Sequence, residues 1–118
     1  MAQSVPQEAP KEAGKDAPRD EVALFVGLLK NPSAGVREHA TSALAAAGDR
    51  SAVPALIETL NDEDAGVREH AANALGALGD TRAAAPLQNR LAGEPNAAVR
   101  EHIISALTKL RSGWAAGR

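Results

Sequence analysis

Apolar residues recur along the chain in a pattern that appears three times. The segments AGVREHATSALAAAGD, AGVREHAANALGALGD and AAVREHIISALTKLRS align almost residue for residue, starting at Ala34, Ala65 and Ala97. Within each segment the apolar positions follow the spacing of an amphipathic helix. The related segments DEVALFVGLLKNPS, RSAVPALIETLNDED and TRAAAPLQNRLAGEPN each precede one of them. A period of this length is typical of stacked helical hairpins.

Residue types favoured at helix ends divide each repeat into two helices. Ser33, Asp64 and Asn96 lie three residues before the repeated valines and are favoured N-cap residues. Gly48 and Gly79 follow the apolar pattern and suit helix C-termini, where a left-handed residue is needed. We predict helices over residues 20–30, 34–47, 51–61, 65–78, 82–92 and 97–111.

The first part of the chain differs in composition from the repeats. From Glu8 it reads EAPK, EAGK and DAPR, with prolines and almost no bulky apolar side chains. Such a segment cannot offset the entropy of folding. We therefore expect a disordered mixed-charge tail over 1–19, a repeat domain over 20–112, and a C-terminal tail over 113–118. The three repeats of the domain are expected at about 20–48, 49–79 and 80–112.

Composition narrows the classes of function. Hydrophobic residues make up 44% of the 118 residues and aromatic residues only 2%, so the core must be built from Ala, Leu, Val and Ile. The net charge of −2 argues against a nucleic-acid binder, which usually carries a basic surplus. Cysteine is absent, and no apolar run is long enough for a signal peptide or a membrane span. We expect a cytoplasmic protein that binds neither nucleic acid nor membrane.

The motif VRxxAxxALGxLGD followed by AVPxLIxxL resembles the short HEAT-like repeats of the phycobilin lyase type. The resemblance covers residues 20 to about 112. It implies an all-α solenoid of three helix–turn–helix repeats, wound as a right-handed superhelix, with the VREH helices on its concave side. The third unit departs from the pattern, because it ends in Leu110-Arg111-Ser112 where the others have Gly-Asp.

A helical wheel assigns the faces of the VREH helices. With the valines at the core, the opposite side carries one glutamate per repeat and small residues such as Thr41, Ala72 and Gly76. This mildly acidic surface favours an extended or basic polypeptide as the ligand. The candidate binding residues are Glu38, Thr41, Glu69, Asn73, Glu101, Ile104 and Thr108.

Arg37, Arg68 and Arg100 occupy one flank of the same helices. In the family an arginine at this position often pairs with acids of neighbouring turns, so the resemblance implies a structural ladder. A phosphate-binding stripe is the alternative, and the glutamate that follows each arginine weakens it.

The dipeptide Glu-His occurs at the same place in every repeat, as Glu38-His39, Glu69-His70 and Glu101-His102. These side chains are possible ligands for a transition metal. Deoxyhypusine hydroxylase, also a HEAT-like repeat enzyme, holds a di-iron centre with His-Glu dyads at comparable positions, but here the order is reversed. The competing interpretation is that His39, His70 and His102 edge the apolar face and bond neighbouring backbone groups or carboxylates.

Two classes of function are compatible with the sequence. We favour a non-enzymatic module without a cofactor that binds a protein or peptide, because no catalytic triad or nucleotide-binding loop is readable. The alternative is a metal-dependent enzyme or a bilin lyase-like accessory protein, although a bilin groove calls for aromatic residues. No polar capping repeat is evident, so the ends could support self-association or attachment to a longer array. The identity of the partner and the oligomeric state stay open.

Overall fold

The computed structural model describes the backbone of residues 19–116 and the side chains of residues 21–112. The tail expected over residues 1–19 therefore lies, except for the backbone of Arg19, outside the described residues. Every element of the described part is helical. In chain order the elements are α1 (Arg19–Leu28), α2 (Ala34–Ala47), η2 (Arg50–Ala52), α3 (Val53–Thr59), α4 (Ala65–Leu78), η3 (Thr81–Ala83), α5 (Ala84–Gly93) and α6 (Ala97–Ala116).

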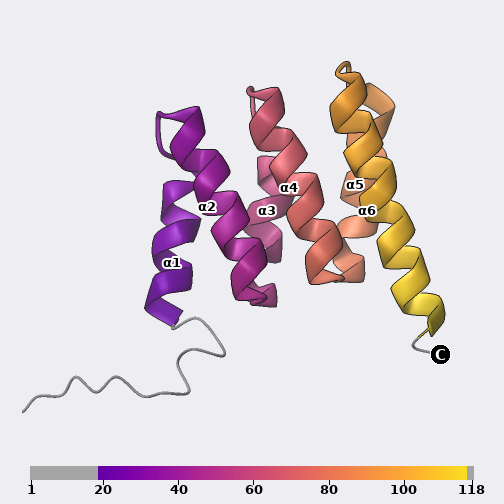
Figure 1. The fold of residues 1–118 in the computed structure, drawn as a ribbon, viewed down its shortest axis with the longest axis horizontal. Helices are drawn as coiled ribbons and strands as arrows, with labels where there is room; N and C mark the ends of the chain where they lie inside the picture. Colours follow the sequence, from indigo (N-terminus) through magenta and orange to yellow (C-terminus); the bar gives the residue numbers. More distant parts are fainter. Residues whose placement is uncertain (1–18, 117–118) are drawn as a thin grey trace, which may run out of the picture.

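The helices form three hairpins, α1–α2, α3–α4 and α5–α6, that stand side by side in chain order (Figure 1). The second helices form one layer of the molecule, in which α2 packs against α4 and α4 packs against α6. The first helices α1, α3 and α5 form the other layer. The prediction of an all-α solenoid of three hairpins is confirmed, whereas the handedness of its superhelix stays a prediction.

The predicted capping residues are found at both kinds of end of the second helices. The side chains of Ser33, Asp64 and Asn96 accept hydrogen bonds from the backbone N–H groups of the valines three residues later. Gly48 and Gly79 have φ of 70° and terminate α2 and α4 in the left-handed conformation. Local sequence thus determines where these helices start and stop.

Three predicted helix boundaries need correction. The helices expected at 51–61 and 82–92 each open with a short 3₁₀ turn, where Asp49 and Asp80 accept the backbone N–H of the residue two positions later. Helix α6 does not end at residue 111 but continues to Ala116. No proline follows Leu110, and a single glycine in a helix costs only about 1 kcal/mol, so nothing in the local sequence terminates α6 there.

The core lies between the two layers and also between successive second helices. Its largest buried side chains include Leu44, Leu56, Leu75, Leu87 and Ile103. The wheel placed Thr41, Ala72 and Gly76 on an open side, and this prediction is wrong because all three are buried. A wheel with one buried face describes a helix in a hairpin, whereas α2 and α4 also bury the flank on which the next repeat packs.

Gly76 allows α4 and α6 to approach each other closely. A Cβ added at Gly76 would lie 3.0 Å from the Cα and 3.1 Å from the Cβ of Ala106, so the backbone of α6 would have to move. Gly27 in α1 is the matched control, because a Cβ there would meet nothing within 4 Å.

We predict that Gly76→Ala destabilises the protein by about 1–3 kcal/mol, the usual effect of overfilling a packed interface. Gly27→Ala should instead stabilise it by about 0.5–1 kcal/mol, since alanine is the better helix former. Urea unfolding of both variants measures the difference. Stabilisation by both substitutions would show that α4 and α6 can separate without loss.

Candidate functional site

Each second helix carries an arginine that reaches back to the loop of its own hairpin. The Nη1 atom of Arg37 donates to the carbonyl oxygens of Asn31 and Pro32 at 2.8 and 3.1 Å. Arg68 donates in the same way to the loop carbonyls of the second repeat, and Arg100 to those of the third. The guanidinium groups therefore satisfy loop carbonyls that helix geometry leaves without partners.

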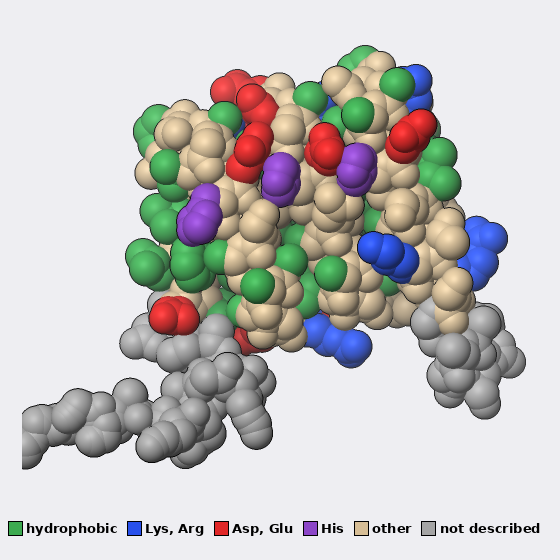
Figure 2. All heavy atoms as spheres, in the orientation of Figure 1, with side chains coloured by type: hydrophobic (Ala, Val, Ile, Leu, Met, Phe, Trp, Pro, Cys, Tyr) green, Lys and Arg blue, Asp and Glu red, His purple; other side chains and the backbone are tan. Residues whose placement is uncertain are grey.

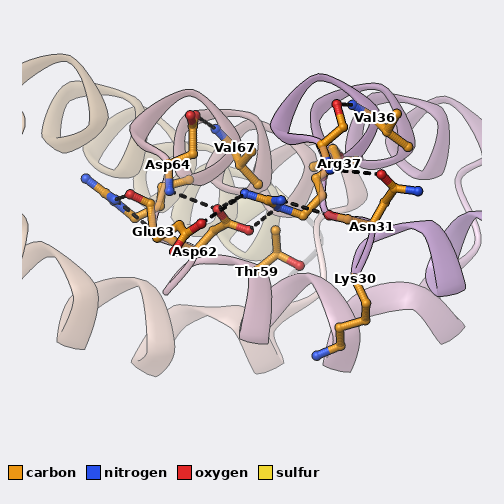
Figure 3. A network of polar contacts seen from close by, with 12 residues as sticks. Lys30, Asn31, Val36, Arg37, Thr59, Asp62, Glu63, Asp64 and Val67 are labelled. Atoms are coloured by element: carbon orange, nitrogen blue, oxygen red, sulfur yellow. Dashed lines mark hydrogen bonds and ion pairs between the residues drawn. The ribbon is translucent and has the colours of Figure 1, made fainter.

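Two of these arginines also reach forward to a carboxylate of the next repeat. Arg37 binds Asp62 through Nε and Nη2 at 2.8 and 3.0 Å, as Figure 3 shows. Arg68 binds Glu94 through the same two atoms, both at 2.8 Å. Paired parallel hydrogen bonds of this kind fix orientation as well as adding energy. We call this series of cross-repeat pairs the arginine ladder.

The carboxylates of the ladder accept hydrogen bonds from the backbone as well as from the arginines. Glu94 is 3% exposed and also accepts the backbone N–H of Asn96, and Asp62 accepts that of Asp64. Burial is the largest single influence on the pKa of Glu94 and Asp62 and acts to raise it. The hydrogen bonds from Arg68 and Arg37, those from the backbone N–H groups, and the nearby arginine charges together outweigh burial, so both pKa values lie below their ordinary values. Outside the ladder, the Arg82 side chain and backbone N–H lower the pKa of Asp80 to about 2.

These depressed pKa values predict acid sensitivity. A group whose pKa is lower in the folded state stabilises the fold above its unfolded value, which is 3.8 for Asp and 4.5 for Glu. The contribution of these carboxylates to the free energy of unfolding should therefore be constant near neutral pH and fall as pH drops below about 4. Chemical denaturation at a series of pH values measures it.

Glu94→Gln should lower stability at pH 7 by roughly 2–3 kcal/mol, because it leaves the guanidinium of Arg68 without its buried counter-charge. It should also remove part of the acid sensitivity. Glu58→Gln is the control, since the Glu58–Lys30 pair is exposed on both sides and such pairs contribute little. Equal losses from the two variants would contradict the structural role of the ladder.

A second feature runs across the same three helices. Figure 2 shows the three histidines of the chain in one line over α2, α4 and α6, with acidic side chains directly above them. In the sequence each histidine directly follows a glutamate at the same repeat position, in the dipeptides Glu38-His39, Glu69-His70 and Glu101-His102. We call this surface the Glu-His face. The structure thus brings together in register the six residues that the sequence singled out.

The histidines of this face are held by their own helices. Nδ1 of His70 lies 2.7 Å from the carbonyl oxygen of Gly66, and Nδ1 of His102 lies 2.8 Å from that of Ala98. A carbonyl oxygen only accepts, so Nδ1 carries the proton in both rings. His39 is exposed and makes an edge-to-face contact with Phe25.

Nε2 of His102 faces Glu69 Oε2 at 3.1 Å across the α4–α6 boundary. Because Nδ1 already holds one proton, Nε2 can donate to this carboxylate only when the ring is charged. The contact is an ion pair whenever the ring carries both protons. It belongs to the type of bond that the structural interpretation of the histidines predicted.

Glu38 occupies a different place from Glu69, although the two are equivalent in the repeat. Its carboxylate lies against Gly66 in the first turn of α4, where a Cβ would collide with it. The third repeat has Ala98 at the position of Gly66, and there the glutamate turns to the histidine instead. The residue at this position decides where the glutamate goes.

We predict that Gly66→Ala displaces the Glu38 carboxylate toward His70, reproducing the pair of Glu69 and His102. The obstructing group is the end of a flexible side chain, so the variant should gain stability by up to about 1 kcal/mol. Gly35→Ala is the matched control at the equivalent position of α2, where a Cβ meets only an ordinary contact. Urea unfolding and the crystal structure of the variant measure the two effects. Loss of stability in Gly66→Ala alone would show that Glu38 is firmly held.

Not all predicted binding residues lie on this surface. Thr41 is fully buried and its hydroxyl donates to the carbonyl oxygen of Arg37, so its assignment as a binding residue is wrong. Asn73, Glu101, Ile104 and Thr108 are exposed. Ile104 and Thr108 occupy the flank of α6 equivalent to the buried flanks of α2 and α4, and are open because no further repeat follows in the structure.

The alternative of a metal site gains no geometric support within residues 21–112. No three His, Asp or Glu side chains of this described part lie close enough together to hold one ion. None of the described helices is long and apolar enough to cross a membrane.

The packed hairpins and the arginine ladder define a helical-repeat solenoid. The sequence profile of HEAT repeats matches residues 21–108, and the chain belongs to this family. Human deoxyhypusine hydroxylase, solved in complex with glycerol, has a similar structure, with a TM-score of 0.77 and 25% sequence identity. The alignment covers 96% of this chain and 42% of that enzyme, so the chain spans less than half of its length. No curated protein sequence matches the chain.

Proposed function

We propose that this chain is a non-enzymatic interaction module that binds a basic polypeptide segment along the Glu-His face. The observation that carries the proposal is the register of that face, with one glutamate and one histidine presented by each of α2, α4 and α6. Repeated acidic groups on a rigid scaffold attract a basic chain and fix its position.

The arrangement of the two helical layers supports the proposal that the Glu-His face lies on the concave side of the solenoid. Successive second helices are in direct contact, whereas a groove of about 420 Å³ lies between α1 and α3 and one of about 330 Å³ between α3 and α5. A stack whose second helices are closer together than its first helices bends toward the second helices. The Glu-His face would then line the concave side.

Geometry also specifies the partner. Packed helices lie about 8–10 Å apart, and a polypeptide in the polyproline II conformation rises about 3.1 Å per residue with three residues per turn, so that every third side chain lies on the same side. A segment that crosses α2, α4 and α6 therefore meets one glutamate about every third residue. We expect lysine or arginine at that spacing in the bound segment.

The test uses a synthetic peptide with lysine at every third position, and a peptide of the same composition with its lysines in one block. We expect the spaced peptide to bind the full chain more tightly, because it matches the spacing of the face. The triple variant Glu38→Gln, Glu69→Gln, Glu101→Gln should lose this binding. Isothermal titration calorimetry at low and moderate salt measures both.

The control is the triple variant Glu21→Gln, Glu58→Gln, Glu63→Gln, which removes the same charge from exposed positions outside the second helices. It should bind the spaced peptide nearly as well as the wild-type chain. If both triple variants lose binding equally, the attraction is a matter of net charge and the Glu-His face is not the site.

A further inference from the structure

The two ends of the array differ in how the arginine ladder finishes. Its carboxylate position is Asn31 in the first repeat, Asp62 in the second and Glu94 in the third. Its arginine position is filled in every repeat. Within the described residues no loop of a following repeat lies beyond Arg100, and the first loop offers an amide where the other two offer an acid.

Arg100 is built like the two arginines that bind the next repeat. Its Nη1 donates to the carbonyl oxygens of Glu94 and Pro95 at 3.0 and 2.9 Å, as the equivalent atoms of Arg37 and Arg68 do in their own loops. The other edge of the Arg100 guanidinium carries Nε and Nη2. In Arg37 and Arg68 the same two atoms bind Asp62 and Glu94 of the next repeat. Within the described residues no carboxylate pairs with that edge. The end of the array thus presents an oriented donor pair for a carboxylate.

The apolar surface beside Arg100 repeats the same pattern. Ile104 is equivalent to Thr41 and Ala72, which are fully buried under the next repeat, yet it is 50% exposed. Thr108 is equivalent to Gly76, which is buried against α6, and it too is exposed. The flank of α6 that carries Arg100, Ile104 and Thr108 corresponds to the flank on which α2 and α4 seat a following hairpin.

We propose that this flank of α6 is a docking surface for a helical hairpin of another polypeptide that carries an aspartate or glutamate in its interhelical loop. The hairpin would add a fourth layer to the stack, with its carboxylate bound by Nε and Nη2 of Arg100. The surface adjoins the Glu-His face at Glu101 but takes a different partner, so the proposal goes beyond the function proposed above.

The comparison of Asn31 with Asp62 and Glu94 argues against a second copy of this chain as the partner. Oδ1 of Asn31 already accepts the backbone N–H of Ser33 at 2.9 Å, as Asp62 Oδ1 accepts that of Asp64. The remaining amide nitrogen of Asn31 is a donor, and it would meet another donor of the guanidinium. Asn31 therefore cannot form the paired bonds of the ladder, and the array is selective at one end.

The experiment uses a variant of this chain as the partner, with the missing carboxylate placed in the loop between α1 and α2. The probe is the full chain with Asn31→Asp and Arg100→Gln, which carries the ladder acid in its first loop but cannot use its own α6 flank. Its docking face is available, because Ala43 in α2 is only partly buried whereas the equivalent Ala74 and Ala106 are buried. Wild-type chain should bind this probe as a 1:1 complex in analytical ultracentrifugation.

The matched control probe carries Arg100→Gln alone and keeps Asn31. We expect it to bind the wild-type chain about tenfold more weakly or worse, since it lacks the charge-assisted pair. Wild-type chain with Ile104→Glu should also lose the probe, and this substitution spares the loop contacts of Arg100. Circular dichroism verifies that each variant is folded.

Two results would overturn the proposal. Equal binding of the Asn31→Asp probe and its control, or no binding of either, would show that Arg100 does not select a carboxylate. The other result is that the wild-type chain self-associates and loses this self-association on Ile104→Glu. A second copy of the chain would then occupy the flank, and no acid in its loop would be needed.

Discussion

The close approach of α2, α4 and α6 is the constraint on which the rest of the structure depends. It is possible because small residues fill the boundary, as where Gly76 of α4 lies against Ala106 of α6. Two consequences follow from it. Arg37 and Arg68 come within reach of the next repeat's loop, and the glutamates and histidines of successive repeats fall into register.

The arginine ladder gives this packing a direction and a register. Small apolar residues would allow neighbouring helices to slide, since alanine and glycine offer few shapes that interlock. A bidentate bond from Arg68 to the buried Glu94 fits in one relative position only. The same bond ties stability to pH, because the carboxylate must stay charged to accept it.

The proposed module would use two surfaces of opposite character. The Glu-His face presents acids along the side of the stack, and the flank of α6 presents a guanidinium and an apolar side chain at its end. A basic segment and an acid-bearing hairpin would therefore bind to neighbouring surfaces that meet at Glu101. Family membership is compatible with this picture but does not identify either partner, and the similar solved structure is an enzyme of more than twice the length aligned here.

The sequence by itself determined the repeat, the helix class and most helix ends, because capping and left-handed residues such as Asp64 and Gly79 act within a few positions. It also singled out the repeated arginine and Glu-His positions. Only the tertiary structure decided that Thr41 and Gly76 are buried, that Glu69 meets His102, and that Glu38 lies against Gly66. These outcomes depend on the neighbouring repeat, which a helical wheel drawn for one helix does not contain. For the same reason the roles of Asn31 and Arg100 at the two ends of the ladder depend on which loop each arginine reaches, and only the tertiary structure shows this.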